Sequence, residues 1–198
     1  MGPDAEGAIG EGARSLGGAS LIVRSPTDAV WAWVGKPEFG REDLDTLGSI
    51  AGSAELRLAI GEPAPGLAGW RLTHDQARAA LPIALRGVER VVRYSHVALV
   101  ATVVRDELLA DSLRRVYLDP LDDQPGRGRQ LRQTLRAYFD ADRSISGAGA
   151  AIGVTRQTVA RRLATAEERL GRPIAHCAAD LELALRFELL GPTPPVAP

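Results

Sequence analysis

Short apolar runs in the first part of the chain predict β-strands. The runs are residues 19–23, 30–34 and 55–60, and hairpin-like turn residues at 24–28 separate the first two. Trp31 and Trp33 lie two positions apart, so they share one face of the second predicted strand. We expect these two rings to pack in a core, with a ligand platform as the alternative.

Helical periodicity alternates with these strands. A helix is predicted over 41–50, and Thr73 and Gln76 have the spacing of a capping box that opens a longer helix. The apolar face of the longer helix consists of Ala77, Ala80, Leu81, Ala84, Leu85, Val88 and Val92. Pro82 would kink this helix, unless the helix begins elsewhere. With a further helical region over 98–117, the pattern predicts a small α+β domain with a mainly antiparallel sheet.

The segment 119–126, rich in turn residues, separates this pattern from one that is entirely helical. One amphipathic helix after it is marked by Leu131, Leu135, Tyr138 and Phe139. A last helix is expected over about 178–190. We therefore predict an α+β domain over 18–118, an all-α domain over 127–190 and a disordered Pro-rich tail over 191–198.

Charge is distributed unevenly along the 198 residues. The formal net charge is −1, yet residues 124–173 hold ten arginines and four acidic residues, which gives +6 there and −7 elsewhere. Lys36 is the only lysine, so arginine is abundant everywhere and only its placement is informative. A basic segment inside an acidic chain indicates an anion-binding module attached to a different domain.

Composition also excludes several classes of protein. Cys177 is the only cysteine, which excludes an internal disulfide and argues against a cysteine-built zinc site. No apolar window of about 18 residues is present, so we expect no membrane span. The start of the chain has acids and glycines where a signal peptide needs basic and then apolar residues. We expect a cytoplasmic protein with no membrane partner.

Residues 144–163 carry the pattern of a helix-turn-helix. Ser144 precedes a short helix of small residues, and Gly153 supplies a turn that tolerates left-handed backbone angles. Thr155 is a good N-cap for a second helix over about 155–166. The apolar seam between the helices consists of Ile152, Val154, Val159 and Leu163. The second helix of such a pair enters the major groove of DNA.

Two sets of side chains are candidates for contact with DNA. The set expected at base edges lies near the N-terminal end of the second helix and consists of Arg156, Gln157 and Arg161. Arginine can bind guanine and glutamine can bind adenine through paired hydrogen bonds. The set expected at phosphates consists of Ser144, Ser146, Thr155, Thr158 and Arg162.

The order and spacing of several motifs resemble PucR/CdaR-type transcriptional regulators. In the helical region the motifs are Leu131-x-x-Thr134-Leu135-x-x-Tyr138-Phe139, Ile152-x-Val154-x-Arg156-x-Thr158-Val159-x-x-Arg162-Leu163, Leu170-Gly171 and Leu181-x-Leu183-Ala184-Leu185. Upstream, Ile60-Gly61-Glu62-Pro63, Gly69-Trp70-Arg71, Thr73-His74-Asp75-Gln76-Ala77 and Ala80-Leu81 resemble the end of a degenerate GGDEF-like domain. The resemblance covers about residues 18–190 and implies a sequence-specific DNA-binding regulator whose first domain has a regulatory or dimerising role.

Three departures from the family pattern concern the DNA-binding domain. The family usually has His-Arg-Asn-Thr where this chain has Thr155-Arg156-Gln157-Thr158. A tyrosine is common at the position of Arg161, and an alanine at the position of Gly149. These departures leave the scaffold intact and bear on the DNA sequence preference.

No catalytic constellation is evident. Gly17-Gly18 is followed by Ala19-Ser20, without the acids that nucleotide cyclisation needs, and the three histidines have no metal-ligand spacing. We expect no enzyme activity, no metal and no cofactor. The expected partners are double-stranded DNA, a second copy of the chain in a homodimer or higher homo-oligomer, and a small-molecule effector. The alternative is a non-catalytic signalling or protein-interaction module with a ligand-sensing α+β domain.

Overall fold

The computed structural model describes residues 5–25, 29–53, 56–122 and 127–191. The chain divides into two compact units, residues 1–101 and 102–198, and each unit is described by itself. The first unit combines helices with short strands and the second is helical, which confirms the predicted α+β class.

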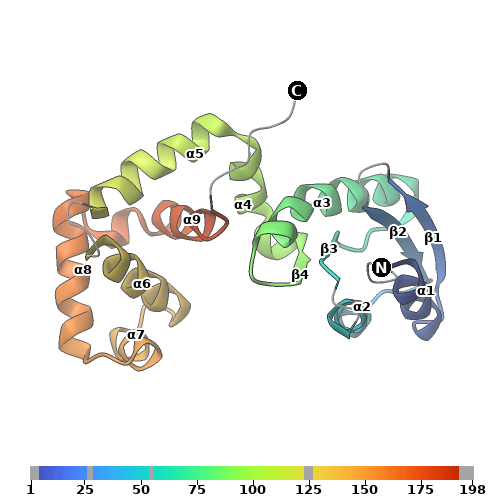
Figure 1. The fold of residues 1–198 in the computed structure, drawn as a ribbon, viewed down its shortest axis with the longest axis horizontal. Helices are drawn as coiled ribbons and strands as arrows, with labels where there is room; N and C mark the ends of the chain where they lie inside the picture. The colour runs from blue at the N-terminus through green and yellow to red at the C-terminus, as the bar shows by residue number, and fades with distance from the viewer. Residues whose placement is uncertain (1–4, 26–28, 54–55, 123–126, 192–198) are drawn as a thin grey trace. The chain divides into compact units, whose positions relative to one another are not determined.

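The first unit contains two separate pairs of strands. Its elements are α1 (Ala5–Ser15), β1 (Ala19–Arg24), β2 (Val30–Gly35), α2 (Arg41–Ser53), β3 (Leu58–Ile60), α3 (Gly66–Arg86), β4 (Val91–Arg93) and most of α4 (Tyr94–Arg105). The strands β1 and β2 form the predicted antiparallel hairpin (Figure 1), and Leu21 stands opposite Trp33 in its register. The strands β3 and β4 pair in parallel, with Ala59 opposite Val92, and this parallel pair was not predicted.

The predicted start of the long helix is wrong. Helix α3 begins at Gly66, so Thr73 lies inside the helix, where its hydroxyl donates a hydrogen bond to the carbonyl oxygen of Trp70 over 3.2 Å. Gln76 does not cap the helix, because its side-chain oxygen accepts the backbone N–H of Glu62 over 2.8 Å. Pro82 lies in the last turns of α3.

The predicted apolar face of this helix is only partly correct. Ala80 and Ala84 are fully buried, whereas Leu85 and Val88 are exposed. Val92 is buried, but in β4 instead of the helix. Helix α1 was not predicted, because its three glycines hide the helical period. It forms nevertheless, and the small residues Gly12 and Ala13 are buried.

The second unit is a bundle of helices. Its elements after α4 are α5 (Glu107–Leu113), the π-helical turn η1 (Arg114–Leu118), the 3-10 turn η2 (Asp119–Asp122), α6 (Arg127–Asp140), α7 (Ile145–Ile152), α8 (Arg156–Leu170), the 3-10 turn η3 (Ile174–His176) and α9 (Ala178–Glu188). The helix predicted over 98–117 is divided at Asp106, whose side chain caps α5 by accepting the N–H of Leu109 over 3.0 Å.

The predicted linker begins inside the second unit. Leu121 is fully buried and belongs to the same core as Leu135 of α6, Val159 of α8 and Leu181 of α9. The division between the units falls near residue 101, ahead of the predicted 119–126 segment. Residues 123–126 of that segment and residues 192–198 of the predicted tail lie outside the described residues.

Candidate nucleic-acid interface

The helix-turn-helix is built from α7, a three-residue turn and α8. Ser144 caps α7, because its hydroxyl oxygen accepts the N–H of Gly147 over 3.1 Å. Gly153 ends α7 with φ of 69°, a left-handed conformation that L residues adopt only at a cost. Thr155 caps α8 by accepting the N–H of Thr158 over 3.1 Å. The two capping residues and the turn glycine therefore adopt the conformations that the sequence predicts for them.

The two helices pack closely at their crossing. A Cβ atom at Gly149 would lie 2.8 Å from the carbonyl oxygen of Val154 and 3.6 Å from a methyl carbon of Val159. Val159 is fully buried and Leu163 nearly so, while Ile152 and Val154 pack against the same core. The absence of a side chain at Gly149 lets the turn fold back onto α7 at this distance.

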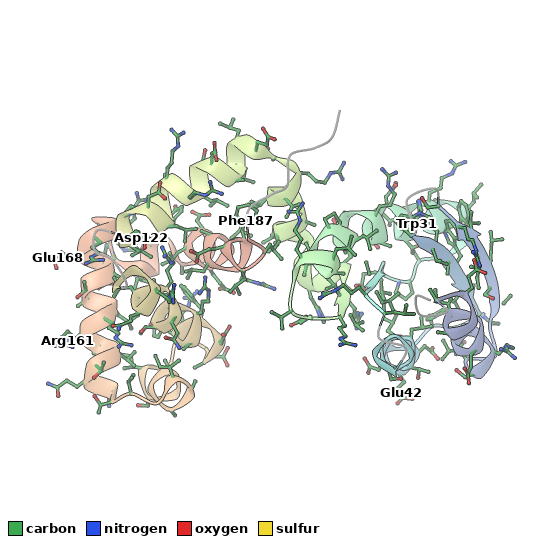
Figure 2. The ribbon with its side chains drawn as sticks, in the orientation of Figure 1. Trp31, Glu42, Asp122, Arg161, Glu168 and Phe187 are labelled. Atoms are coloured by element: carbon green, nitrogen blue, oxygen red, sulfur yellow. The ribbon has the colours of Figure 1, made fainter. Side chains whose placement is uncertain are left out.

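The opposite face of α8 is open. Arg156, Gln157, Ala160 and Arg161 are all exposed, and Figure 2 shows Arg161 on the outer side of the helix. The structure thus places all three predicted base-reading side chains on one surface near the N-terminal end of α8.

Two helix N-termini flank this surface. Ser144, Ser146 and Thr155 are exposed and Thr158 is half-buried, all within the first residues of α7 or α8 or at their caps. The hydroxyls of Thr155 and Thr158 lie 2.9 Å apart. Free N–H groups and the helix dipole favour anions at such ends, so these hydroxyls stand where phosphates bind well.

Arg162 is placed differently from the prediction. It is half-buried and turned toward α6, where its guanidinium donates to the hydroxyl of Thr134 over 3.1 Å and to the side-chain oxygen of Gln130 over 3.3 Å. Thr134 is fully buried, and its own hydroxyl donates to the carbonyl of Gln130 over 2.8 Å. Arg162 therefore joins α8 to α6.

The arginines of the basic segment fall into two groups. One group is engaged within the fold: Arg132, Arg136, Arg162, Arg169 and Arg172 contact Asp122, Glu188, Thr134, the carbonyl of Leu121 and the ring of Tyr117. The other group is exposed, and its side chains make no hydrogen bond or ion pair to the residues that the structure describes: Arg129, Arg143, Arg156 and Arg161. Sequence reasoning did not single out Arg129 and Arg143, although Arg143 directly precedes the cap residue Ser144.

The histidines and the cysteine form no catalytic cluster. His74 is held between two rings of β2, 4.8 Å from Trp31 and 5.0 Å from Trp33, so it is not the solvated residue of a first helical turn. Cys177 is buried, and burial raises the pKa of its thiol, which keeps the unreactive protonated form. Among the described residues, no three His, Cys, Asp or Glu side chains come together as a metal site.

Comparison with known protein families agrees with this architecture. The PucR C-terminal helix-turn-helix domain matches residues 131–187, which contain α7 and α8. A GGDEF-like domain matches residues 2–83, beginning earlier than the predicted residue 18. The chain has the architecture of a PucR-type regulator. The comparison with curated protein sequences gives no match.

The PucR-type helix-turn-helix domain supports a DNA-binding regulator of the PucR family. The GGDEF-like domain supplies the α+β part of the chain, with α1, the β1–β2 hairpin and most of α3 inside the matched residues. In the described part of the chain, no helix has both the length and the apolar character that crossing a bilayer requires.

Proposed function

We propose that the chain regulates transcription as a PucR-type protein of the CdaR kind, by inserting α8 into the major groove of duplex DNA. Arg156, Gln157 and Arg161 contact base edges in this proposal. Ser144, Ser146, Thr155 and Thr158 contact phosphates beside the groove. The segment that enters the groove is about 155–166.

One observation carries the proposal. The start of α8 exposes two arginines and a glutamine, while Val159 and Leu163 on the opposite face are buried in the core. A recognition helix needs this combination, because its polar face must be free of the protein and its apolar face must fix its orientation. The guanidinium groups of Arg156 and Arg161 have no partner among the described residues, so both are available to DNA.

Arg162 takes a positioning role in this proposal. Its bonds to Thr134 and Gln130 hold α8 at a fixed angle on α6. A phosphate contact from the same guanidinium would compete with these bonds. The four hydroxyls and the exposed Arg129 and Arg143 are left to engage the DNA backbone.

The remaining parts of the proposal concern the whole regulator. The DNA-binding domain spans 127–190, and the domain over 18–118 senses a small-molecule effector or mediates dimerisation. We propose a homodimer or higher homo-oligomer, because helix-turn-helix proteins commonly bind paired half-sites. The location is cytoplasmic, where a bacterial regulator meets its operator.

The test is a selection of bound duplexes from a random-sequence library, followed by titration of the selected duplex by fluorescence anisotropy. We expect Arg161→Ala to lower affinity for the selected duplex about 5- to 100-fold and to reduce discrimination against single-base variants. Arg115→Ala, which removes another exposed arginine of the second unit, is the matched control and leaves both unchanged. Equal loss on all duplexes would contradict the base contact of Arg161. No enrichment of any duplex would contradict DNA recognition and favour a protein-interaction module.

A further inference from the structure

A large cavity lies inside the first unit. Its volume is about 850 Å³, and its lining contains every residue from 29 to 36, which includes all of β2, and every residue from 56 to 61, which includes all of β3. Helices α1, α2 and α3, with loop residues at 37, 39 and 63–65, supply the remaining walls. The cavity thus follows the full length of two strands that do not pair with each other.

The uninterrupted lining shows that the cavity runs along strand edges. Side chains alternate between the two faces of a strand, so a cavity above one face would be lined by every second residue. Here consecutive residues line it on both strands. Within the described residues, β2 pairs only with β1 and β3 only with β4, so each strand has one edge without a neighbour.

The hairpin identifies the backbone groups on the open edge of β2. The N–H of Ser25 donates to the carbonyl of Ala29 over 2.8 Å, and these residues stand opposite each other in the continuation of the β1–β2 register. In an antiparallel pair, hydrogen-bonded and non-bonded positions alternate. The N–H and C=O groups of Val30, Ala32 and Val34 therefore point away from β1, toward the open edge.

The same reasoning applies to β3. Its residue Leu58 donates its N–H to the carbonyl of Arg90, the residue directly before β4, over 2.7 Å. Successive residues of a strand turn their backbone groups to opposite edges. The N–H and C=O groups of Ala59 therefore point away from β4. Both sides of the cavity offer backbone donors and acceptors, which is the chemistry that an added strand satisfies.

The cavity requires no charge from its occupant. Its lining is mostly apolar, and its two basic residues are already engaged. The ammonium of Lys36 lies 2.8 Å from Asp43, and the guanidinium of Arg57 donates to the carbonyls of Ala84 and Gly87 over 2.6 and 2.7 Å. An uncharged, apolar segment matches these walls.

We propose that this cavity is a strand-accepting slot, filled by an extended, uncharged apolar segment of another polypeptide that inserts between β2 and β3. The inserted strand hydrogen-bonds to the free edge of β2 on one side and of β3 on the other. It joins the two strand pairs into one five-stranded sheet and covers the half-buried β2 side chains. Strand addition of this kind draws affinity from main-chain hydrogen bonds and specificity from alternate side chains.

The probe is a capped peptide of six residues, alternating threonine and valine, because β2 has six residues. Amide hydrogen exchange, resolved by NMR, is measured on the whole chain with and without the peptide. We expect exchange at Val30, Ala32, Val34 and Ala59 to slow at least tenfold, since these amides gain partners. The same peptide with alternate backbone nitrogens methylated keeps its side chains and loses its donors, so it should not protect them.

A pair of proline variants separates the two edges of the hairpin. Ala32→Pro removes an N–H that points into the slot, and we expect it to abolish binding of the peptide. Ser20→Pro is the matched control, because the alternation places its N–H on the outer edge of β1, and binding should persist. Tryptophan fluorescence checks that both variants keep the fold, since Trp31, Trp33 and Trp70 all lie in this unit.

Three results would overturn the proposal. Equal binding of the methylated peptide would identify an apolar pocket without strand addition. Protection of the same amides that grows with protein concentration, without peptide, would identify a second copy as the occupant. Lack of protection by either peptide at millimolar concentration would show that the slot does not accept a strand.

Discussion

At the scale of single residues, two glycines decide whether α7 and α8 can meet. Gly153 needs a left-handed backbone, and Gly149 has no room for a side chain. A side chain at position 149 would need a wider crossing than the one found here. The sequence has glycine at both positions, but only the structure shows that Gly153 is required for its backbone conformation and Gly149 for lack of space.

We predict that Gly149→Ala destabilises the second unit by about 1–3 kcal/mol, because the new methyl group would lie 2.8 Å from the carbonyl oxygen of Val154. Thermal unfolding followed by circular dichroism should show a lower midpoint. Tryptophan fluorescence reports only the first unit and should not change. Ala150→Ser, an exposed change on the same helix, is the control. An unchanged midpoint would mean that the turn relaxes freely.

Glu62 is one residue through which pH acts on the stability of the first unit. Burial acts to raise the pKa of this carboxyl, but hydrogen bonds from Ser95 and Arg93 outweigh it and hold the pKa below its ordinary value of 4.5. A carboxyl with a lowered pKa in the folded state stabilises that state above its unfolded pKa, and the stabilisation is lost as the pH falls through the folded pKa.

We predict that Glu62→Gln lowers the free energy of unfolding of the first unit by about 1 kcal/mol at pH 7. The difference between variant and parent should shrink below pH 4.5 and vanish once Glu62 itself is protonated. Urea unfolding monitored by tryptophan fluorescence at several pH values measures this difference. A difference independent of pH would show that the charge of Glu62 plays no part.

At the scale of elements, features set by interactions between residues close in sequence were predicted, and features set by distant residues were not. Both ends of α7 and the start of α8 are set by Ser144, Gly153 and Thr155, which act on residues three or four positions away, and these ends were predicted correctly. The helix α8 continues to Leu170, four residues beyond the predicted end. The direction of Arg162 depends on Thr134, which lies 28 residues earlier, and its role was not predicted. The start of α3 was missed for the same reason. The side chain of Gln76, expected to cap the helix locally, instead accepts the N–H of Glu62, which lies 14 residues earlier.

The strand pairs extend this lesson to the first unit. The hairpin was predictable because only five residues of the sequence separate β1 from β2. The whole of α3 lies between β3 and β4 in the sequence, so no local pattern in either three-residue strand predicts that they pair. The capping side chains of α7 and α8 can be tested directly, because each is expected both to stabilise its helix and to contact DNA.

We predict that Ser144→Asp and Thr155→Asp separate these two roles. Aspartate caps helices at least as well as serine or threonine, and a negative charge suits a helix N-terminus, so the unfolding midpoint should stay the same or rise slightly. The same charge repels phosphate, so affinity for DNA should fall at least tenfold in anisotropy titrations at low salt. Ser144→Asn and Thr155→Asn retain the cap without the charge and serve as controls. Unchanged affinity for DNA in the aspartate variants would show that both hydroxyls cap their helices and do not contact phosphates.

At the scale of the whole molecule, the formal charge of +6 over residues 124–173 is larger than the positive charge that is exposed and free to bind DNA. Five arginines of the basic segment are engaged within the second unit, where Glu188 alone contacts both Arg132 and Arg136. Four remain exposed among the described side chains: Arg129, Arg143, Arg156 and Arg161. Counterion release depends on the phosphates that are actually neutralised, so the engaged arginines contribute little to it.

The salt dependence of binding should therefore be shallow for so basic a segment. Each neutralised phosphate contributes a slope of about −0.9 to log K against log salt, so Arg129 and Arg143, the exposed arginines left to phosphates, give about −2 per bound chain, against about −9 if all ten took part. Arg129→Ala and Arg143→Ala together should remove most of this slope, whereas Arg156→Ala and Arg161→Ala, which act at base edges, should change it little. The double replacement Arg132→Lys and Arg136→Lys, within the ion pairs of α6 and α9, should leave it unchanged. A slope near −9 would mean that the internal ion pairs open on DNA, and a slope near zero would remove electrostatic binding from the mechanism.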